Sequence, residues 1–217
     1  MIKASISKQT LKRLPMYLSY LKSLPGGGPS NISATSIAEG LNLNDVQVRK
    51  DLAAVSSGGR PKIGYVTEEL IADIECFLYF DDTDSAIIVG AGNLGRALLN
   101  YEGFSDYGLN ILAAFDIDES LCGATPHGKK ILPLSKMSAL CERLKIGIGI
   151  IAVPSASAQE VCDMLTDKGV KAIWNFSPTF LRVPEGVLVQ NENIAASLAV
   201  LSKHLAHRMN DTASAVR

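Results

Sequence analysis

Two different spacings of apolar residues divide the chain. In the first third, apolar positions recur every three or four residues, as at Leu14, Leu18 and Leu21, which is the spacing of an amphipathic helix. From residue 86 onward, short apolar runs alternate with helical patterns, which indicates buried parallel strands joined by helices. The sequence therefore predicts a helical domain over residues 1–80 and an α/β domain over residues 81–192, with an Asp-rich boundary at 81–84.

The first domain has the pattern of a winged helix. Its expected elements are helices at 7–24, 33–40, 44–55 and 67–80 and a hairpin at 56–66. Asn44 and Gln47 form a capping-box-like start of the third helix, in which Val46, Leu52 and Val55 are expected to face the core. A helix, a tight turn and a capped second helix make a helix-turn-helix, and the hairpin adds the wing.

Charge is divided unevenly between the two halves. Residues 1–66 carry nine Lys and Arg against three acidic residues, whereas the remainder carries 12 against 19. A basic first third on an acidic body favours a polyanion partner, and double-stranded DNA with a palindromic operator fits a helix-turn-helix. The alternative is an ordinary solvated surface. The candidate DNA-contacting residues are Gln47, Arg49, Lys50, Arg60 and Lys62.

The second domain is predicted to be a Rossmann-like, doubly wound parallel sheet. Strands are expected at 86–90, 109–116, 130–131, 146–153, 170–175 and 187–190, and helices at 93–101, 135–144 and 155–168. A terminal helix begins at residue 193, within a C-terminal segment that spans 193–217. Its stripe of Ile194, Leu198, Leu201 and Leu205 suits either a cover for the sheet or a dimer contact, and the pattern leaves both open.

A glycine-rich turn follows the first strand of the second domain. In the run Gly90-Ala91-Gly92-Asn93-Leu94-Gly95, the first glycine permits a tight turn and the second lets the backbone approach a pyrophosphate. The third glycine allows close packing of helix on strand. The N-terminus of the following helix then supplies free N–H groups for the phosphates. The turn alone is weak evidence for a dinucleotide.

An acidic residue strengthens that interpretation. Asp116 ends the second strand, 21 residues after Gly95, where it can accept hydrogen bonds from an adenosine ribose. Since no Lys or Arg accompanies it to hold a 2′-phosphate, NAD(H) is favoured over NADP(H). Val153, Pro154 and Asn175 end later strands at the same edge and are candidates for the nicotinamide half, although turn formation alone would also explain the proline.

The motifs supply a cofactor site without evident catalytic groups. An NAD-dependent dehydrogenase needs a proton donor or acceptor beside the hydride path. Tyr101 follows the glycine turn but has no lysine four residues on, and no separate substrate domain is present. A small dehydrogenase or reductase remains the alternative, and a DNA-binding scaffold that keeps the nucleotide for structure alone is a third possibility. We therefore expect no catalytic residue and no metal site.

These motifs together resemble the Rex family of bacterial redox-sensing repressors over nearly the whole chain. The resemblance is carried by Arg13, Val46 through Leu52, Gly64, Tyr65, Val89 through Gly95, Tyr101, Phe115 through Asp118, Val153, Pro154, Asn175 and Phe176. It implies a homodimer with swapped terminal helices, in which NADH closes the DNA-binding domains away from the operator and NAD⁺ competes without that effect. It also implies that Tyr101 belongs to the NADH site and that the target genes serve fermentation and NADH reoxidation.

Two segments depart from the family pattern. The family shows an aromatic, glycine-punctuated run after Leu52 that leads to an Arg-Gly wing, whereas this chain continues Ala53-Ala54-Val55 and has Arg60-Pro61-Lys62 at the wing tip. The family also places an Asp near the start of the terminal helix, which anchors the switch with the Tyr101 and Arg13 positions. This chain has Ala195 there.

The remaining composition is that of a cytoplasmic protein. No apolar run reaches the 18 residues of a membrane span, and the N-terminus lacks the apolar core of a signal peptide. The four cysteines are scattered without metal-ligand spacing, which is typical of reduced thiols in the cytoplasm.

Overall fold

A computed structural model describes residues 6–25, 28–78, 84–125 and 128–215. The chain divides into two compact units, residues 1–82 and 83–217. Each unit has its own apolar core. The expected Asp-rich boundary lies, apart from Asp84, outside the described residues. No helix in the described ranges is long and apolar enough to cross a bilayer.

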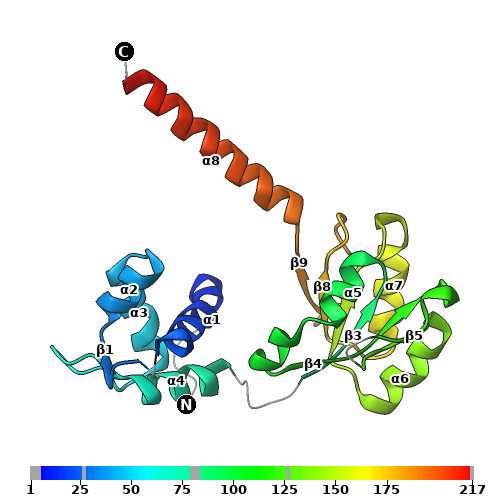
Figure 1. The fold of residues 1–217 in the computed structure, drawn as a ribbon. Coiled ribbons are helices and arrows are strands. Elements are labelled where there is room, and N and C mark those ends of the chain that lie inside the picture. The colour runs from blue at the N-terminus through cyan, green and yellow to red at the C-terminus, as the bar shows by residue number, and fades with distance from the viewer. Residues whose placement is uncertain (1–5, 26–27, 79–83, 126–127, 216–217) are drawn as a thin grey trace. The chain divides into compact units, whose positions relative to one another are not determined.

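In its described residues the first unit contains four α-helices and a two-stranded sheet (Figure 1). Its elements are α1 (Lys8–Ser23), β1 (Asn31–Ile32), α2 (Ala34–Leu41), α3 (Asp45–Val55), β2 (Tyr65–Val66) and α4 (Thr67–Leu78). Leu14, Leu18 and Leu21 of α1 are buried among side chains of α2, α3 and α4. The helical spacing of the sequence therefore identified this core correctly.

The wing differs in detail from the expected hairpin. Arg60 and Gly64 close a tight turn through two backbone hydrogen bonds, and Lys62 within it has a φ of 64°. The strand that follows, β2, pairs antiparallel with β1 and not with the segment before the turn. The turn is thus attached to the helical core through the two residues of β1.

One predicted orientation in α3 is wrong. Val46 is 49% exposed, whereas Val48 is fully buried beside Leu52. Val48, Leu52 and Val55 follow the spacing of four and three that one face of a helix requires, and Val46 does not share that face. Gln47, Arg49 and Lys50 are exposed as expected.

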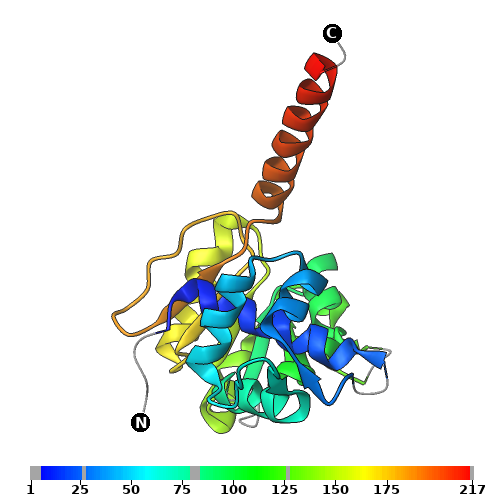
Figure 2. The same ribbon diagram turned by 90° about the vertical axis from the view of Figure 1, so that its left-hand side faces the viewer.

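Among the described residues the second unit is a mostly parallel sheet flanked by helices, which is the Rossmann-like architecture that the sequence predicts (Figure 1 and Figure 2). Its seven strands lie in the order β5-β6-β4-β3-β7-β8-β9, and β5 is an addition to the six expected strands. The strands are β3 (Asp84–Val89), β4 (Leu109–Asp116), β5 (Gly123–Ala124), β6 (Lys130–Pro133), β7 (Ile148–Ile151), β8 (Ala172–Asn175) and β9 (Leu188–Asn191). All pairs are parallel except β5 with β6. The order reverses at β3, which lies between β4 and β7, and such a switch point is where open α/β sheets bind ligands.

Helices cover both faces of this sheet. Alternate residues of β3 supply the two cores: Ile87 and Val89 pack with α6 (Met137–Leu144) and α7 (Ser155–Asp167), and Ile88 packs with α5 (Asn93–Leu99). The last helix, α8 (Ile194–Ala215), follows β9. Its side chains from Ala195 to Ala206 are all exposed, so α8 does not cover the sheet of its own chain.

Candidate functional site

The glycine turn connects the carboxyl end of β3 to α5. Gly90 has a φ of 101°, and a Cβ on it would lie 2.5 Å from the carbonyl oxygen of Ala152. A Cβ on Gly95 would lie 1.8 Å from the carbonyl oxygen of Gly90, so α5 packs directly against the turn. Gly92 faces open space, with no heavy atom within 4 Å of an added Cβ. The turn is therefore tight at Gly90 and Gly95 and accessible at Gly92.

The carboxylate of Asp116 ties the end of β4 to this turn. Its Oδ2 accepts the N–H of Ala91 at 2.6 Å, and its Oδ1 accepts the N–H of Asp118 at 2.9 Å. Asp118 in turn accepts the hydroxyl and the N–H of Ser120, and these hydrogen bonds lower the pKa of Asp118 below its usual value. Two carboxylates thus stand beside the glycine turn.

A cavity of about 470 Å³ opens at this edge of the sheet. It is bounded by the ends of β3 and β4, by the segment after β7 and by α7. Its walls include five of the residues predicted for a cofactor site, namely Gly90, Gly92, Asp116, Val153 and Pro154. The sequence motifs are therefore brought together at the switch point of the sheet.

The other residues of the motif lie beside this cavity. Ala91 and Gly95 are buried within the turn and its packing on α5, and Leu94 is half-buried. Asn93 is exposed at the start of α5, where its side-chain oxygen accepts a hydrogen bond from Arg96. These residues form the glycine turn and the N-terminal end of α5, but they do not line the cavity themselves.

Two of the residues predicted to bind the cofactor do not line this cavity. Tyr101 is 59% exposed, packs edge-on against Phe104 and lines a separate hollow. Asn175 is fully buried, and its amide donates to Ser177, Thr179 and Asn191 while its oxygen accepts the N–H of Ser177. In this structure the side chain of Asn175 therefore holds the segment after β8, and its contact with a nicotinamide stays a prediction.

Sequence reasoning missed several residues of the cavity wall. They are Val89, Phe115, Ile117, Asp118, Leu121, Leu134, Ala152, Ser157, Glu160, Val161 and Met164. The helical spacing of Ser157, Glu160 and Met164 marks one face of α7 and could have identified that wall. None of the described residues that line the cavity is a His, Lys, Arg, Tyr or Cys, so the polar side chains of the wall are three carboxylates and the hydroxyl of Ser157.

A second candidate surface lies on the first unit. Gln47, Arg49 and Lys50 project from α3, and Arg60 and Lys62 occupy the wing turn, all exposed. Arg49, Arg60 and Lys62 line one groove together with the start of α2. Arg49 also pairs with Asp45 at 3.2 Å across one turn of α3. This single carboxylate is outnumbered by the cations of the surface, which keeps a net positive charge. Cations gathered on and beside a helix of this kind suit contact with a phosphate backbone.

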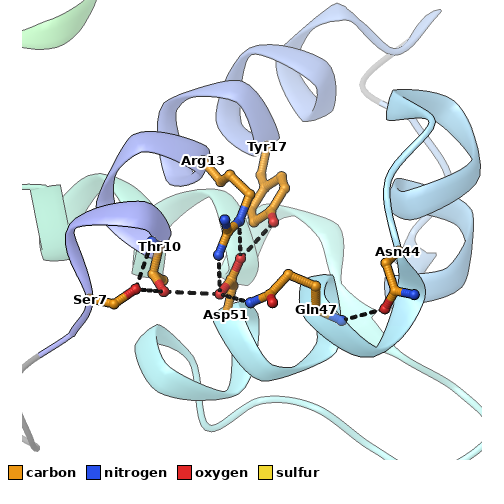
Figure 3. A network of polar contacts seen from close by, with 7 residues as sticks. All are labelled: Ser7, Thr10, Arg13, Tyr17, Asn44, Gln47 and Asp51. Carbon is orange, nitrogen blue, oxygen red and sulfur yellow. Dashed lines mark hydrogen bonds and ion pairs between the residues drawn. The ribbon is translucent and has the colours of Figure 1, made fainter.

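Asp51 connects this surface to the core of the first unit (Figure 3). Its side chain is 2% exposed and accepts five hydrogen bonds from four residues. Arg13 donates its Nε to Oδ2 at 2.6 Å and its Nη2 to Oδ1 at 3.1 Å. Tyr17 donates to Oδ2 at 2.7 Å, and Thr10 and Gln47 donate to Oδ1 at 3.1 and 2.9 Å. The carboxylate thereby joins α1 to α3.

The hydrogen bonds keep this buried group ionised. Burial alone would raise the pKa of Asp51, but the donors Arg13, Tyr17, Gln47 and Thr10 outweigh burial and hold that pKa below its usual value. Burial and the adjacent carboxylate raise the pKa of Tyr17 to about 12. The bond to Asp51 raises the pKa of Arg13. This network could not be recognised from sequence patterns, because its partners are up to 41 residues apart along the chain.

Two family models match the chain. One, described as a putative DNA-binding protein N-terminus, covers residues 5–53, and the other, described as a CoA binding domain, covers residues 81–179. The first coincides with α1 through most of α3, and the second with the sheet up to the segment after β8.

Curated relatives match over nearly the full length. The redox-sensing transcriptional repressor Rex of Bacteroides thetaiotaomicron is 40% identical over 92% of this chain and 91% of its own. The Rex protein of Syntrophomonas wolfei subsp. wolfei is 40% identical over 93% of this chain and 96% of its own.

Solved structures give the same result. A crystal structure of RSP in complex with β-NAD⁺ and operator DNA is 34% identical, with a TM-score of 0.86 and coverage of 97% of both chains. RSP in complex with β-NADH has a TM-score of 0.85 at the same identity, over 97% of this chain and 99% of its own.

Proposed function

Because this chain belongs to the Rex family of redox-sensing transcriptional repressors, we propose that it binds operator DNA and is released from it by NADH. The observation that carries this proposal is the cavity at the switch point of the sheet. It combines an accessible glycine turn with the Asp116 carboxylate, and no proton-transfer group except carboxylates lines its described wall. Such a site suits a protein that senses a dinucleotide without reducing a substrate.

The carboxylates of the cavity favour NAD(H) as the ligand. Asp116, Asp118 and Glu160 line it, and none of its described lining residues is a cation. A 2′-phosphate, as in NADP(H), or the 3′-phosphate of CoA would meet like charge there. We accordingly assign the adenosine ribose to Asp116, the pyrophosphate to the turn from Gly90 to Gly95 and the nicotinamide half to Val153 and Pro154. Tyr101 belongs to this site only by its family position.

The DNA-contacting surface is assigned to the exposed residues of α3 and the wing turn, Gln47, Arg49, Lys50, Arg60 and Lys62. The exposed apolar side chains of α8 support a homodimer through this helix, since a monomer would leave Leu198, Leu201 and Leu205 in water. A two-fold dimer presents two reading helices to a palindromic site. Such a repressor acts in the cytoplasm, where its operator and its nucleotides are found.

A titration of a fluorescent operator duplex tests the proposal. A palindromic duplex selected from a pool with randomised half-sites is bound to the protein, and NADH, NAD⁺, NADPH or CoA is then added. We expect NADH to release the DNA at concentrations at which NADPH and CoA do not, and NAD⁺ to oppose NADH. DNA binding that ignores NADH would contradict the sensing role, and consumption of NADH with a small carbonyl substrate would favour a dehydrogenase.

A further inference from the structure

The side chain of Gln47 lies at the edge of the Asp51 network, on the exposed side of α3 (Figure 3). Its backbone N–H is bound by the side-chain oxygen of Asn44, which caps the helix, as the sequence predicted. The other half of the expected capping box is absent, because the Gln47 amide does not return to Asn44. Its Nε2 donates instead to Oδ1 of Asp51, one helical turn further on, at 2.9 Å.

This hydrogen bond fixes the orientation of the Gln47 side-chain amide. Asp51 is ionised and already accepts from Thr10, Arg13 and Tyr17, so it has no proton to offer. Only the nitrogen of Gln47 can face it. The oxygen Oε1 then points away from the network, and among the described residues it has no hydrogen-bond partner. A free glutamine amide shows either end to a ligand, whereas this one is held by its nitrogen.

Fixed orientation has a consequence in the major groove of DNA. There adenine and cytosine present exocyclic amino donors, whereas guanine and thymine present acceptors. An outward-facing carbonyl oxygen pairs with the first two bases and meets like dipoles on the other two. Adenine also offers its N7 to the amide hydrogen that Asp51 leaves free.

We propose that Asp51 is a positioning residue for base selection: it holds Gln47 by its nitrogen, so that Gln47 selects adenine or cytosine through its oxygen. The inference rests on the proposed DNA-binding function and adds to it the class of base that this residue reads. Arg13, Tyr17 and Thr10 act one step further back, since they keep the carboxylate buried, charged and in place.

Binding of operator duplexes substituted one base pair at a time tests this. Two surface variants probe the oxygen: Gln47→Met removes the amide, and Gln47→Glu keeps oxygens while losing the donor. At one base pair of each half-site we expect the wild type to prefer adenine or cytosine on the contacted strand by about tenfold. Gln47→Met should lose this preference at that base pair alone, and Gln47→Glu should keep it despite weaker binding to all DNA.

Variants of Asp51 probe the positioning step. In Asp51→Asn the buried side chain can accept or donate, so Gln47 turns freely and the preference should fall severalfold at the same base pair. Asp51→Glu keeps a charge for Arg13 but displaces the carboxylate oxygens, so it should reduce the base preference in the same way. It serves as the test if the Asp51→Asn variant fails to fold. Tyr17→Phe, which removes a donor to the other carboxylate oxygen, is the matched control and should keep the preference.

The outcomes separate the two proposals. A preference that survives in both Asp51 variants, or a Gln47-dependent preference for guanine or thymine, would overturn the positioning role while leaving the repressor intact. A general loss of affinity for every sequence, with unchanged base preference, would show that Asp51 only stabilises the fold. If no duplex binds even at low salt, the DNA-binding function itself fails, and the inference fails with it.

Discussion

The backbone of Gly95 lies so close to the carbonyl oxygen of Gly90 that a Cβ on Gly95 would sit 1.8 Å from that oxygen. Gly95→Ala must therefore push α5 away from the turn. We expect a loss of about 1–3 kcal/mol in the free energy of unfolding of the second unit, which is the usual cost of overpacking, together with loss of NADH binding. Denaturant unfolding and calorimetry measure the two effects.

Gly92→Ala is the matched control in the same turn. Gly92 has a φ of −65° and open space around its Cβ position, so alanine is accommodated and the unfolding free energy should stay within about 0.5 kcal/mol. NADH should nevertheless bind more weakly, since the added methyl occupies the approach to the backbone. Unchanged NADH affinity in this variant would mean that the pyrophosphate does not lie over Gly92.

Asp116→Ala should weaken NADH binding by about 1–3 kcal/mol, the cost of losing hydrogen bonds to a charged acceptor. The same change frees the N–H of Ala91 in the turn. Asp118→Ala is the comparison, because Asp118 binds Ser120 and not the glycine turn. Calorimetry that finds equal losses in the two variants would remove the specific ribose role from Asp116. DNA affinity without nucleotide should be unchanged in both.

Arg13→Met should destabilise the first unit by about 3 kcal/mol, because it leaves a buried carboxylate without its cation. The control is Lys22→Met, which breaks the ion pair of Lys22 with Glu75 between α1 and α4. Those two side chains are 46% and 32% exposed, and the loss should stay below about 1 kcal/mol. Hydrogen exchange of the amides in α1 and α3 reports the opening free energy of this unit directly. Equal protection of these amides from exchange in Arg13→Met and Lys22→Met would mean that the Arg13–Asp51 pair contributes no more than an exposed ion pair.

Acid should weaken the same unit. Since the pKa of Asp51 is lower in the folded chain than in the unfolded chain, the unfolded state takes up a proton first as the pH falls. The stabilisation is complete above the unfolded pKa and is lost progressively as the pH drops toward the folded one. Asp51→Asn should be less stable at neutral pH and should show a shallower decline in acid. If the opening free energies of the wild type and of Asp51→Asn fell in parallel as the pH is lowered, the acid sensitivity would not come from Asp51.

This chain has Ala195 where the Rex family places an Asp, and this difference should affect how NADH binding is coupled to DNA release. Alanine cannot accept a hydrogen bond through its side chain or pair with a guanidinium, and in this structure Arg13 is already bound to Asp51. We expect NADH to release DNA with weaker coupling than in relatives that keep the Asp, the typical coupling between two sites being about 1–3 kcal/mol. Ala195→Asp should strengthen it. Because linkage is reciprocal, NADH affinity measured with and without operator gives the coupling. A hundredfold shift in the wild type would show that the carboxylate is dispensable.

The local patterns of the sequence were sufficient for the fold and for one edge of the site. Buried strands such as Ile87 to Val89 and the glycine turn are encoded within a few residues, so periodicity and spacing identify them. The position of Asp116 follows from the same logic, because parallel strands bring their carboxyl ends to one edge.

Contacts between distant segments were beyond that reasoning. Asp51 lies on a helix among exposed polar neighbours, and only the packing of α1 against α3 shows that it is buried. Apolar character places Val46 inward, but it does not give the phase of a helix that has few apolar positions, and Val46 is exposed. Asn175 ends a strand as a ligand-binding residue would, but its amide donates inward to Thr179 and to Asn191 at the end of β9.

In the homodimer that we propose, the exposed apolar side chains of α8 make the active form of the protein depend on its concentration. Leu198, Val200, Leu201 and Leu205 all face water in the single chain, and two copies that bury them obey mass action. Dilution would then separate the two reading helices, and each half would lose the gain in effective concentration that a joined pair has on a palindrome. For the proposed dimer the number of copies in the cell would then set the operator occupancy alongside the nucleotide, and gene dosage would influence repression directly.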